Sequence, residues 1–367
     1  MSPLLAQLDS SLRSVVDATE RSELLARKSC ALARIGRYDD ARQIVDDLRS
    51  AYGDGRDGRI SVWIMLAEGL ILWFSELSPA AADRIARAQF LSGAMKYSTM
   101  IALASAWKAH IEFETSKFES MIGSLGTAID HAEMQNVDAR ARISVVLCSS
   151  FALCGDRTKA QFWFLRGRDY ALKAGDQASI EALQFNRAVL LVAALRADSC
   201  IAELQVNDIR TVRLEFESAR NLQALTHIET LDNHGRLSEA RLLMLEKRYA
   251  EAIAALRAVR DRRPFANYHF NTSLLDLEVA FCTLKLRGVE DALNLFCDTD
   301  ASTFTELDVD DQLAAAWMQH QMAIADKRFG FADDYRACFD KLAKTYEASR
   351  QALRVGLQSV NAERLQN

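Results

Sequence analysis

Proline is scarce in this chain of 367 residues, in which only Pro3, Pro79 and Pro264 occur. Average usage is roughly 5%. Proline removes a backbone donor and clashes with the preceding helical turn, so it interrupts helices. A long chain with so few interruptions is expected to be helical almost throughout. Half of its residues are apolar, which supplies enough surface for a packed core and excludes wholesale disorder.

Long apolar runs are missing as well. The longest lies at Ala188–Leu195, well short of the roughly 20 residues that a membrane helix needs. The N-terminal residues lack the basic segment and the uninterrupted apolar stretch of a secretory signal. We therefore predict a cytoplasmic protein without membrane contact.

Closely spaced cysteines and a strong charge of either sign are also absent. The seven cysteines form no C-x-x-C pair, which argues against a zinc site. Most are expected to be buried thiols in a reducing compartment. The net charge of −5 is mild and makes a dedicated nucleic-acid-binding protein an unfavoured interpretation.

Signatures of nucleotide binding, serine hydrolases and zinc proteases do not occur in the sequence. The segment Gly53–Gly58 fits G-x-G-x-x-G, but a helix instead of a strand is expected before it. Its aspartates would also repel phosphate, so we interpret it as a connection between repeats. The group from His227 to His234 matches no zinc spacing. We expect a non-enzymatic protein with no catalytic residue, metal or cofactor.

What the chain does contain is a repeat of about 40 residues. Each copy has a turn, then an anchor residue early on a second helix, then apolar residues four and seven positions later. The anchors are Ala41, Ala81, Met121, Ala160, Ala252, Ala292 and Asp334. A gap of about two periods predicts one weaker copy near Cys200 and Ala202. One helix pair cannot bury its own apolar face, so pairs must stack. The pattern predicts an all-α fold of about eight antiparallel helix pairs.

Two copies resemble the tetratricopeptide repeat. In one, Tyr249, Ala252, Leu256, Val259 and Pro264 fall at the offsets of that family, and the copy that begins at Gly36 agrees except at its last position. The period is longer than the usual 34 residues and nearer to HEAT or armadillo repeats. The chain is similar to the long-repeat variety in the sensor regions of bacterial LuxR-type activators. This resemblance implies a right-handed α-solenoid that serves as a binding or regulatory module.

We predict a single repeat domain over 1–367, with an N-terminal helix or cap in 1–20, repeats in 21–331 and a long C-terminal helix in 332–367. Residues along that last helix step by three and four, as in a coiled coil. They are Phe339, Leu342, Tyr346, Ser349, Leu353, Gly356 and Val360. Two interpretations stay open: a helix that caps the last repeat, or one that forms a homodimer.

The resemblance places the functional surface in a concave groove lined by the first helix of each pair. The predicted groove residues are Trp63, Leu66, Leu70, Trp73, Ala106, His110, Phe113, Arg142, Val145, Ser149, Phe185 and Arg241, with Ala26, Cys30, His234 and Leu237 beside them. The family's carboxylate clamp of Lys and Asn is not reproduced there. A protein or peptide partner with apolar side chains is the favoured prediction. The alternative is a regulator that senses a small molecule or peptide and signals through the C-terminal helix.

Two charged segments remain. Arg140–Lys173 carries seven basic residues with aromatics between them, so nucleic acid or an acidic peptide is a further alternative to a solvated outer helix. The acidic segment Asp298–Asp311 fails as a calcium loop because its sixth position is Thr303. We interpret it as a solvated connection, with Asp310 and Asp311 near a helix N-terminus.

Overall fold

The computed structural model describes residues 2–365 apart from 54, 56, 227–231, 262–270 and 296–300. This part of the chain holds seventeen α-helices, two short 3-10 helices and no strand. The predicted all-α class is therefore confirmed.

After α1 (Pro3–Ser14), consecutive helices pack side by side in eight pairs within the described residues. The pairs are α2 (Ala18–Arg34) with α3 (Tyr38–Tyr52), α4 (Gly58–Glu76) with α5 (Ala80–Ala94), α6 (Ser98–Glu114) with α7 (Phe118–His131), α8 (Val137–Leu153) with α9 (Arg157–Lys173), α10 (Gln177–Ile201) with α11 (Val206–Thr226), α12 (Asp232–Leu245) with α13 (Tyr249–Arg260), α14 (Thr272–Arg287) with α15 (Val289–Leu293), and α16 (Val309–Ala325) with α17 (Phe329–Ser359). The 3-10 helices are η1 (Ala301–Phe304) and η2 (Ala362–Leu365).

The turn inside a pair is built in the same way five times. The residue two positions before the second helix has a positive φ, and it is Gly36, Ser116, Gly155, Lys247 or Lys327. The amide of the next residue donates to a carbonyl five positions back, as Arg37 N does to Leu32 O at 3.0 Å. This Schellman arrangement satisfies the last carbonyls of the first helix. The recurrence shows that the repeat is one of backbone geometry as well as of sequence.

The anchors follow the prediction, with two corrections. Ala41, Ala81, Met121, Ala160, Ala252 and Ala292 are all buried. The last anchor is Ala332, because the helix begins at Phe329, and the predicted Asp334 is exposed. The weak copy near Cys200 is also displaced. Cys200 lies at the end of α10, a first helix of 25 residues, and the second helix does not begin until Val206.

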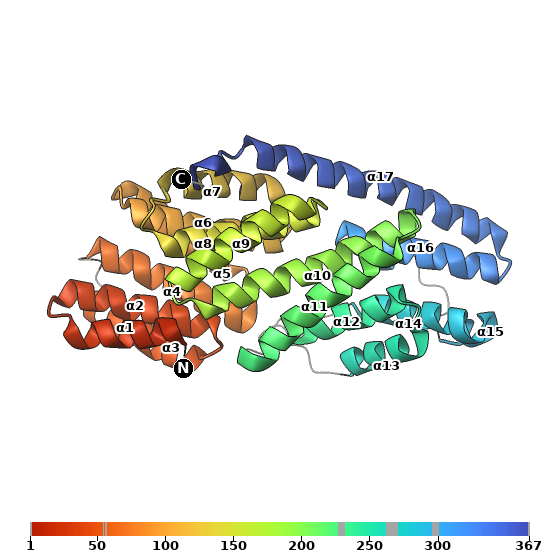
Figure 1. Ribbon diagram of the computed structural model, residues 1–367, viewed down its shortest axis with the longest axis horizontal. Helices are drawn as coiled ribbons and strands as arrows, with labels where there is room; N and C mark the ends of the chain where they lie inside the picture. The colour runs from red at the N-terminus through yellow and green to blue at the C-terminus, as the bar shows by residue number, and fades with distance from the viewer. Residues whose placement is uncertain are drawn as a thin grey trace.

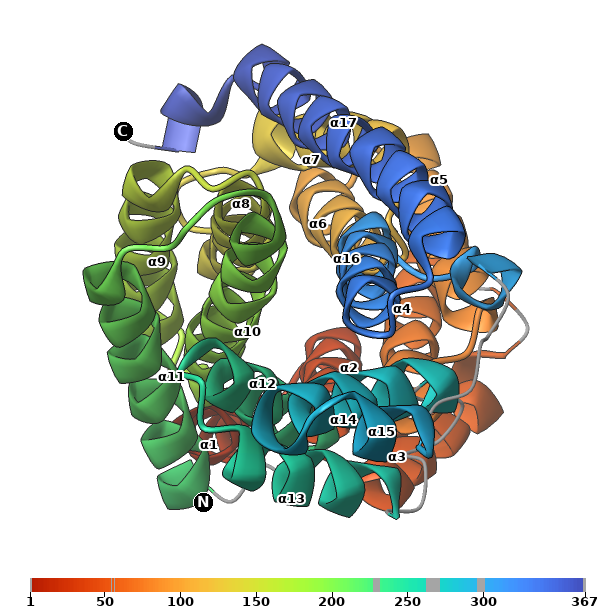
Figure 2. The same ribbon diagram turned by 90° about the vertical axis from the view of Figure 1, so that its right-hand side faces the viewer.

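First and second helices differ in how they are buried. The helices α6 and α8 are buried on nearly every side, as expected for helices that are apolar all round. Their partners bury only one stripe, which on α7 includes Met121, Leu125 and Ala128. In the end-on view the first helices lie inside and the second helices outside (Figure 2). Surfaces of the first helices therefore face the interior of the molecule.

The C-terminal helix α17 runs back across the molecule to the N-terminal half (Figure 1). Phe339 and Tyr346 pack with α16, whereas Leu353 and Val360 belong to the large N-terminal core. Most of the predicted stripe is thus covered within the chain itself, while Ser349 is exposed. The helix ends at Ser359 instead of continuing towards the C-terminus, because Val360 is extended and Leu365 is buried, its carbonyl accepting from the Tyr170 hydroxyl at 2.7 Å.

Two helices, α4 and α10, are long and apolar enough to cross a membrane by length and composition alone. In the folded chain, half or more of their most apolar window is buried inside the protein. Core helices of soluble proteins behave in this way, and the structure is compatible with a soluble protein.

Candidate functional site

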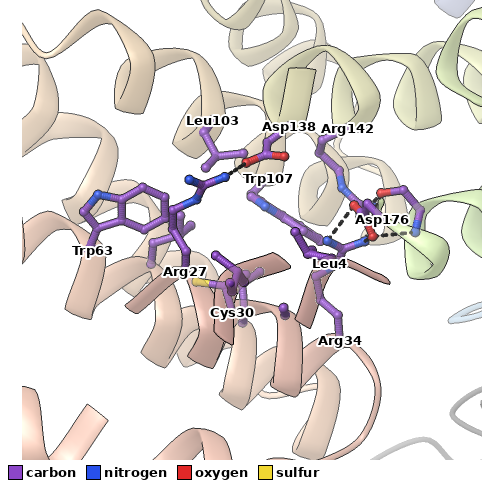
Figure 3. A pocket seen from close by; sticks show the side chains of 15 residues that line it. Leu4, Arg27, Cys30, Arg34, Trp63, Leu103, Trp107, Asp138, Arg142 and Asp176 are labelled. Atoms are coloured by element: carbon purple, nitrogen blue, oxygen red, sulfur yellow. Dashed lines mark hydrogen bonds and ion pairs between the residues drawn. The ribbon is translucent and has the colours of Figure 1, made fainter. Parts of the chain in front are cut away.

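A cavity of about 50 Å³ lies between α1, α2, α4, α6, α8 and the N-terminal end of α10 (Figure 3). Its apolar walls come from Leu4 and Leu8 on α1, Leu66 and Leu70 on α4, and Leu103 on α6. The walls therefore come from the N-terminal cap and the first helices of five pairs. The remaining lining consists of five charged side chains, two tryptophans and the small residues Cys30, Ala31 and Ser179.

The cavity exists because the N-terminal helices meet the α9–α10 turn. The amide of Leu4 donates to the carbonyl of Gly175 at 3.0 Å. Gly175 has a φ of 64°, and a Cβ there would lie 3.2 Å from the Leu4 nitrogen. Only glycine fits this turn without strain. The contact brings the start of the chain to the start of α10.

One ion pair holds this junction together, and a second joins α2 to α8. Arg34 and Asp176 form a bidentate pair, with both nitrogen–oxygen distances at 2.8 Å. Asp176 also caps α10 by accepting from Ser179 N at 3.1 Å. Burial acts to raise the pKa of Asp176, but the Arg34 guanidinium holds that pKa below its ordinary value. Arg27 pairs with Asp138 at 3.0 Å on the other side of the cavity.

A third arginine lines the cavity without a carboxylate of its own. Arg142 on α8 is only 3% exposed, and its guanidinium carbon lies 3.6 Å from the ring centroid of Trp107. It reaches Ser179 Oγ with one long hydrogen bond of 3.5 Å. Its Nε has no hydrogen-bond partner among the described residues. Burial and the neighbouring Arg34 charge lower the pKa of Arg142.

The titratable groups behind Trp107 do not neutralise this arginine. His110 stacks edge-on against Trp107, and burial with the charges of Arg142 and Arg34 lowers its pKa, so it is neutral. Glu114, at the end of α6, is exposed and does not line the cavity. Glu114 makes no hydrogen bond to Arg142 within the described residues. The cavity lining therefore has one cation more than it has anions.

A second charged cluster joins the first helices of the C-terminal half. The Glu278 carboxylate on α14 accepts from Arg196 Nη1 at 2.7 Å and from Arg241 Nε at 2.9 Å. Arg196 and Arg241 also pair with Asp311, and Asp310 lies 3.8 Å from Arg196. Glu278 is fully buried.

The expectation that Asp310 and Asp311 are solvated is thus wrong. They do lie in the first turn of α16, but the interior arginines draw them inwards. Burial and the Asp311 charge raise the pKa of Asp310 to about 6. Burial also acts to raise the pKa of Asp311, but Arg241 and Arg196 hold it below its ordinary value.

The predicted groove residues are divided between these places. Trp63, Leu66, Leu70, Arg142 and Cys30 line the cavity. Trp73, Ala26, Ala106, His110, Phe113, Val145, Ser149, Phe185 and Leu237 are buried beside other helices, and His234 is half-buried. Arg241 belongs to the C-terminal cluster. The structure brings the first group together and leaves little exposed surface on the second.

The basic segment is likewise divided. Arg140 and Arg142 are buried, and Arg140 reaches the Tyr170 hydroxyl at 3.2 Å. On α9, Lys173 pairs with Asp169 and Arg166 lies over Phe162. In the segments His227–His234 and Asp298–Asp311, the residues His227, Glu229, Asp298 and Asp300 lie outside the described part of the chain. Among the residues that are described, no group of three metal-ligating side chains occurs.

Sequence reasoning missed Arg27, Arg34, Trp107, Asp138 and Asp176. Arg27 and Arg34 are seven apart and share the helix face of the predicted Cys30, which is a signal that could have found them. Trp107 is one position from the predicted Ala106. The two aspartates gave no such signal, because their importance depends on the contact between α1, α2 and α10.

The sequence matches no protein-family model and no curated protein. The candidate site therefore depends on its own geometry.

Proposed function

We propose that the protein is a non-enzymatic regulatory module, built as a tetratricopeptide-like superhelix, that binds a small ligand in the N-terminal cavity. The observation that carries this proposal is the lining. Residues from six helices, from Leu4 to Ser179, surround one cavity that contains a buried arginine without an ion pair in the described chain. A pocket with apolar walls and a few convergent polar groups is the usual form of a ligand site.

A ligand there would influence the whole molecule through α10. The N-terminal end of this helix contributes Asp176 and Ser179 to the cavity, and Arg196 near its other end lies in the C-terminal cluster. About 20 residues of helix separate them, or about 30 Å. A ligand that binds one arrangement of α1, α2 and α10 more tightly than another shifts the population of the two. Through α16, that shift would reach α17, the predicted output helix.

The other predictions from the sequence remain open. A protein or peptide partner on the inner face is the second candidate, but the burial of most predicted groove residues leaves less surface for it than the cavity offers a small ligand. Nucleic-acid binding through α9 and a homodimer through α17 are less favoured. Cytoplasmic location is also part of the proposal, supported by six free cysteines in the described residues.

The test is native mass spectrometry of the purified protein mixed with a protein-free metabolite extract. Ala31→Met places a longer side chain in the cavity, since Ala31 lines it. The matched control is Gly93→Ala, where a Cβ meets nothing within 4 Å. We expect a bound small molecule on wild type and control that Ala31→Met loses. Equal binding by all three proteins, or none by wild type, would contradict the proposal.

A further inference from the structure

Three arginines and two aspartates line the N-terminal cavity. Arg27 with Asp138 and Arg34 with Asp176 account for four of them as ion pairs. Arg142 is the cation left over, and Cys30 does not offset it, because burial raises the pKa of that thiol to about 12. The lining thus has an excess charge of +1.

A buried cation without a partner is costly, and proteins normally pair such groups or remove them. Here the stacking of Arg142 on Trp107 compensates for part of that cost. The unpartnered Nε lies beside a guanidinium nitrogen on the same planar fork, which is the geometry that a carboxylate binds with two parallel hydrogen bonds. In Figure 3 the Arg142 side chain extends from α8 towards Trp107 and Asp176.

Ser179 adds a second polar contact. Its hydroxyl oxygen accepts from Arg34 Nη2 at 2.9 Å and from Arg142 Nη2 at 3.5 Å. The hydroxyl is therefore positioned to donate its own proton to an anion beside Arg142.

The size of the cavity limits the ligand. About 50 Å³ holds roughly three to five water molecules, at about 10–15 Å³ for each. The leucine side chains of α1, α4 and α6 favour a carbon body over a second charged group. An ordinary dicarboxylate or a phosphate dianion would leave the cavity with excess negative charge.

We propose that the N-terminal cavity binds a short aliphatic monocarboxylate, whose carboxylate pairs with Arg142 and Ser179 while its hydrocarbon part lies against the leucines. This inference rests on the proposed ligand-binding function and specifies the chemical class of the ligand.

The probes are sodium acetate and sodium propionate, which replace chloride at constant ionic strength, with acetamide and propionamide as matched neutral compounds. The readout is the thermal melting temperature. At ten times the dissociation constant we expect the carboxylates to raise the wild-type melting temperature by about 2 °C or more. The amides should leave it unchanged, because they lack the charge.

Arg142→Met should abolish the shift, and Arg142→Lys should weaken binding about tenfold, since lysine keeps the charge but lacks the fork. The control Arg87→Met, on the exposed face of α5, removes one positive charge elsewhere and should keep the full shift. If Arg142→Met does not fold, Arg142→Lys still decides the question.

Equal shifts in wild type and Arg142→Met, or no carboxylate shift in wild type, would overturn the monocarboxylate proposal. The ligand-binding function would survive that result if the extract ligand still bound wild type and not Ala31→Met. Both proposals would be contradicted only if neither the melting experiment nor the native mass spectrometry showed binding.

Discussion

The two charged clusters of this protein are built from the same residue types but are balanced differently. In the C-terminal half, Glu278 accepts from two arginines and two further carboxylates surround them. In the N-terminal cavity, two arginines have carboxylates and Arg142 has none among the described residues. One cluster has a formal excess of negative charge within the fold, and the other has an excess of positive charge facing a cavity.

This difference indicates different purposes. Buried charges that satisfy one another fix how α10, α12, α14 and α16 sit, and removing one member leaves the others without a partner. A buried charge that faces a cavity and has no partner is available to a ligand. Substitution of one member of each cluster tests whether the two clusters differ in this way.

The largest effect is expected at Glu278. Glu278→Gln removes a fully buried charge that faces both Arg196 and Arg241. We expect the free energy of unfolding in urea to fall by about 3–5 kcal/mol. The control Glu251→Gln disrupts only an exposed pair with Arg248 and should leave the urea midpoint of unfolding nearly unchanged. A similarly small loss at Glu278 would show that the cluster does not hold the helices together.

A smaller effect that depends on pH is expected at Asp310. Because its pKa is raised from 3.8 to about 6, the folded state binds more protons than the unfolded state between these values. Its contribution to stability is present below pH 3.8 and is lost as pH rises through about 6. Asp310→Asn should therefore be close to wild type near pH 4 and exceed it by about 2–3 kcal/mol at pH 7.5.

Urea unfolding at a series of pH values measures this difference. The pKa of Glu114 is also raised. Because Glu114 is present in both proteins, its contribution to the pH dependence cancels in the difference between them. A stability difference that stays constant from pH 4 to 7.5 would show that Asp310 titrates normally.

The smallest effect is expected at Arg142. Arg142→Met keeps the packing on Trp107 and removes a buried cation that has one long hydrogen bond. We expect a change of less than about 1 kcal/mol in the free energy of unfolding, of either sign. A loss above about 2 kcal/mol would place Arg142 with Glu278 as a structural charge.

Local patterns predicted the all-α class and the helix pairs, since apolar first helices and a turn about every 40 residues depend on neighbours in the sequence. The predicted anchor Asp334 is wrong because an aromatic residue stands three positions before it, as one also stands three positions before Ala332. Only the start of the helix at Phe329 shows that Ala332 is the anchor. Local patterns could not predict the two charged clusters, because their members are far apart in the sequence. Arg34 and Asp176 are 142 positions apart, and their contact depends on where α1 and α2 meet α10. Asp310 and Asp311 were read as solvated for the same reason, because Arg196 and Arg241 reach them only in the folded chain.

The most direct measurement compares two arginine side chains that share one feature. Neither Arg142 Nε nor Arg196 Nε has a hydrogen-bond partner among the described residues, and Arg196 already faces three carboxylates. Their Nε–Hε resonances can be followed by NMR in protein labelled with ¹⁵N-arginine, and each is assigned from the spectrum of its Arg→Lys variant. On addition of acetate, we predict that the Arg142 proton moves downfield while that of Arg196 stays in place. An Arg142 resonance that does not move, or equal movement of both, would contradict the assignment of the cavity as a carboxylate site.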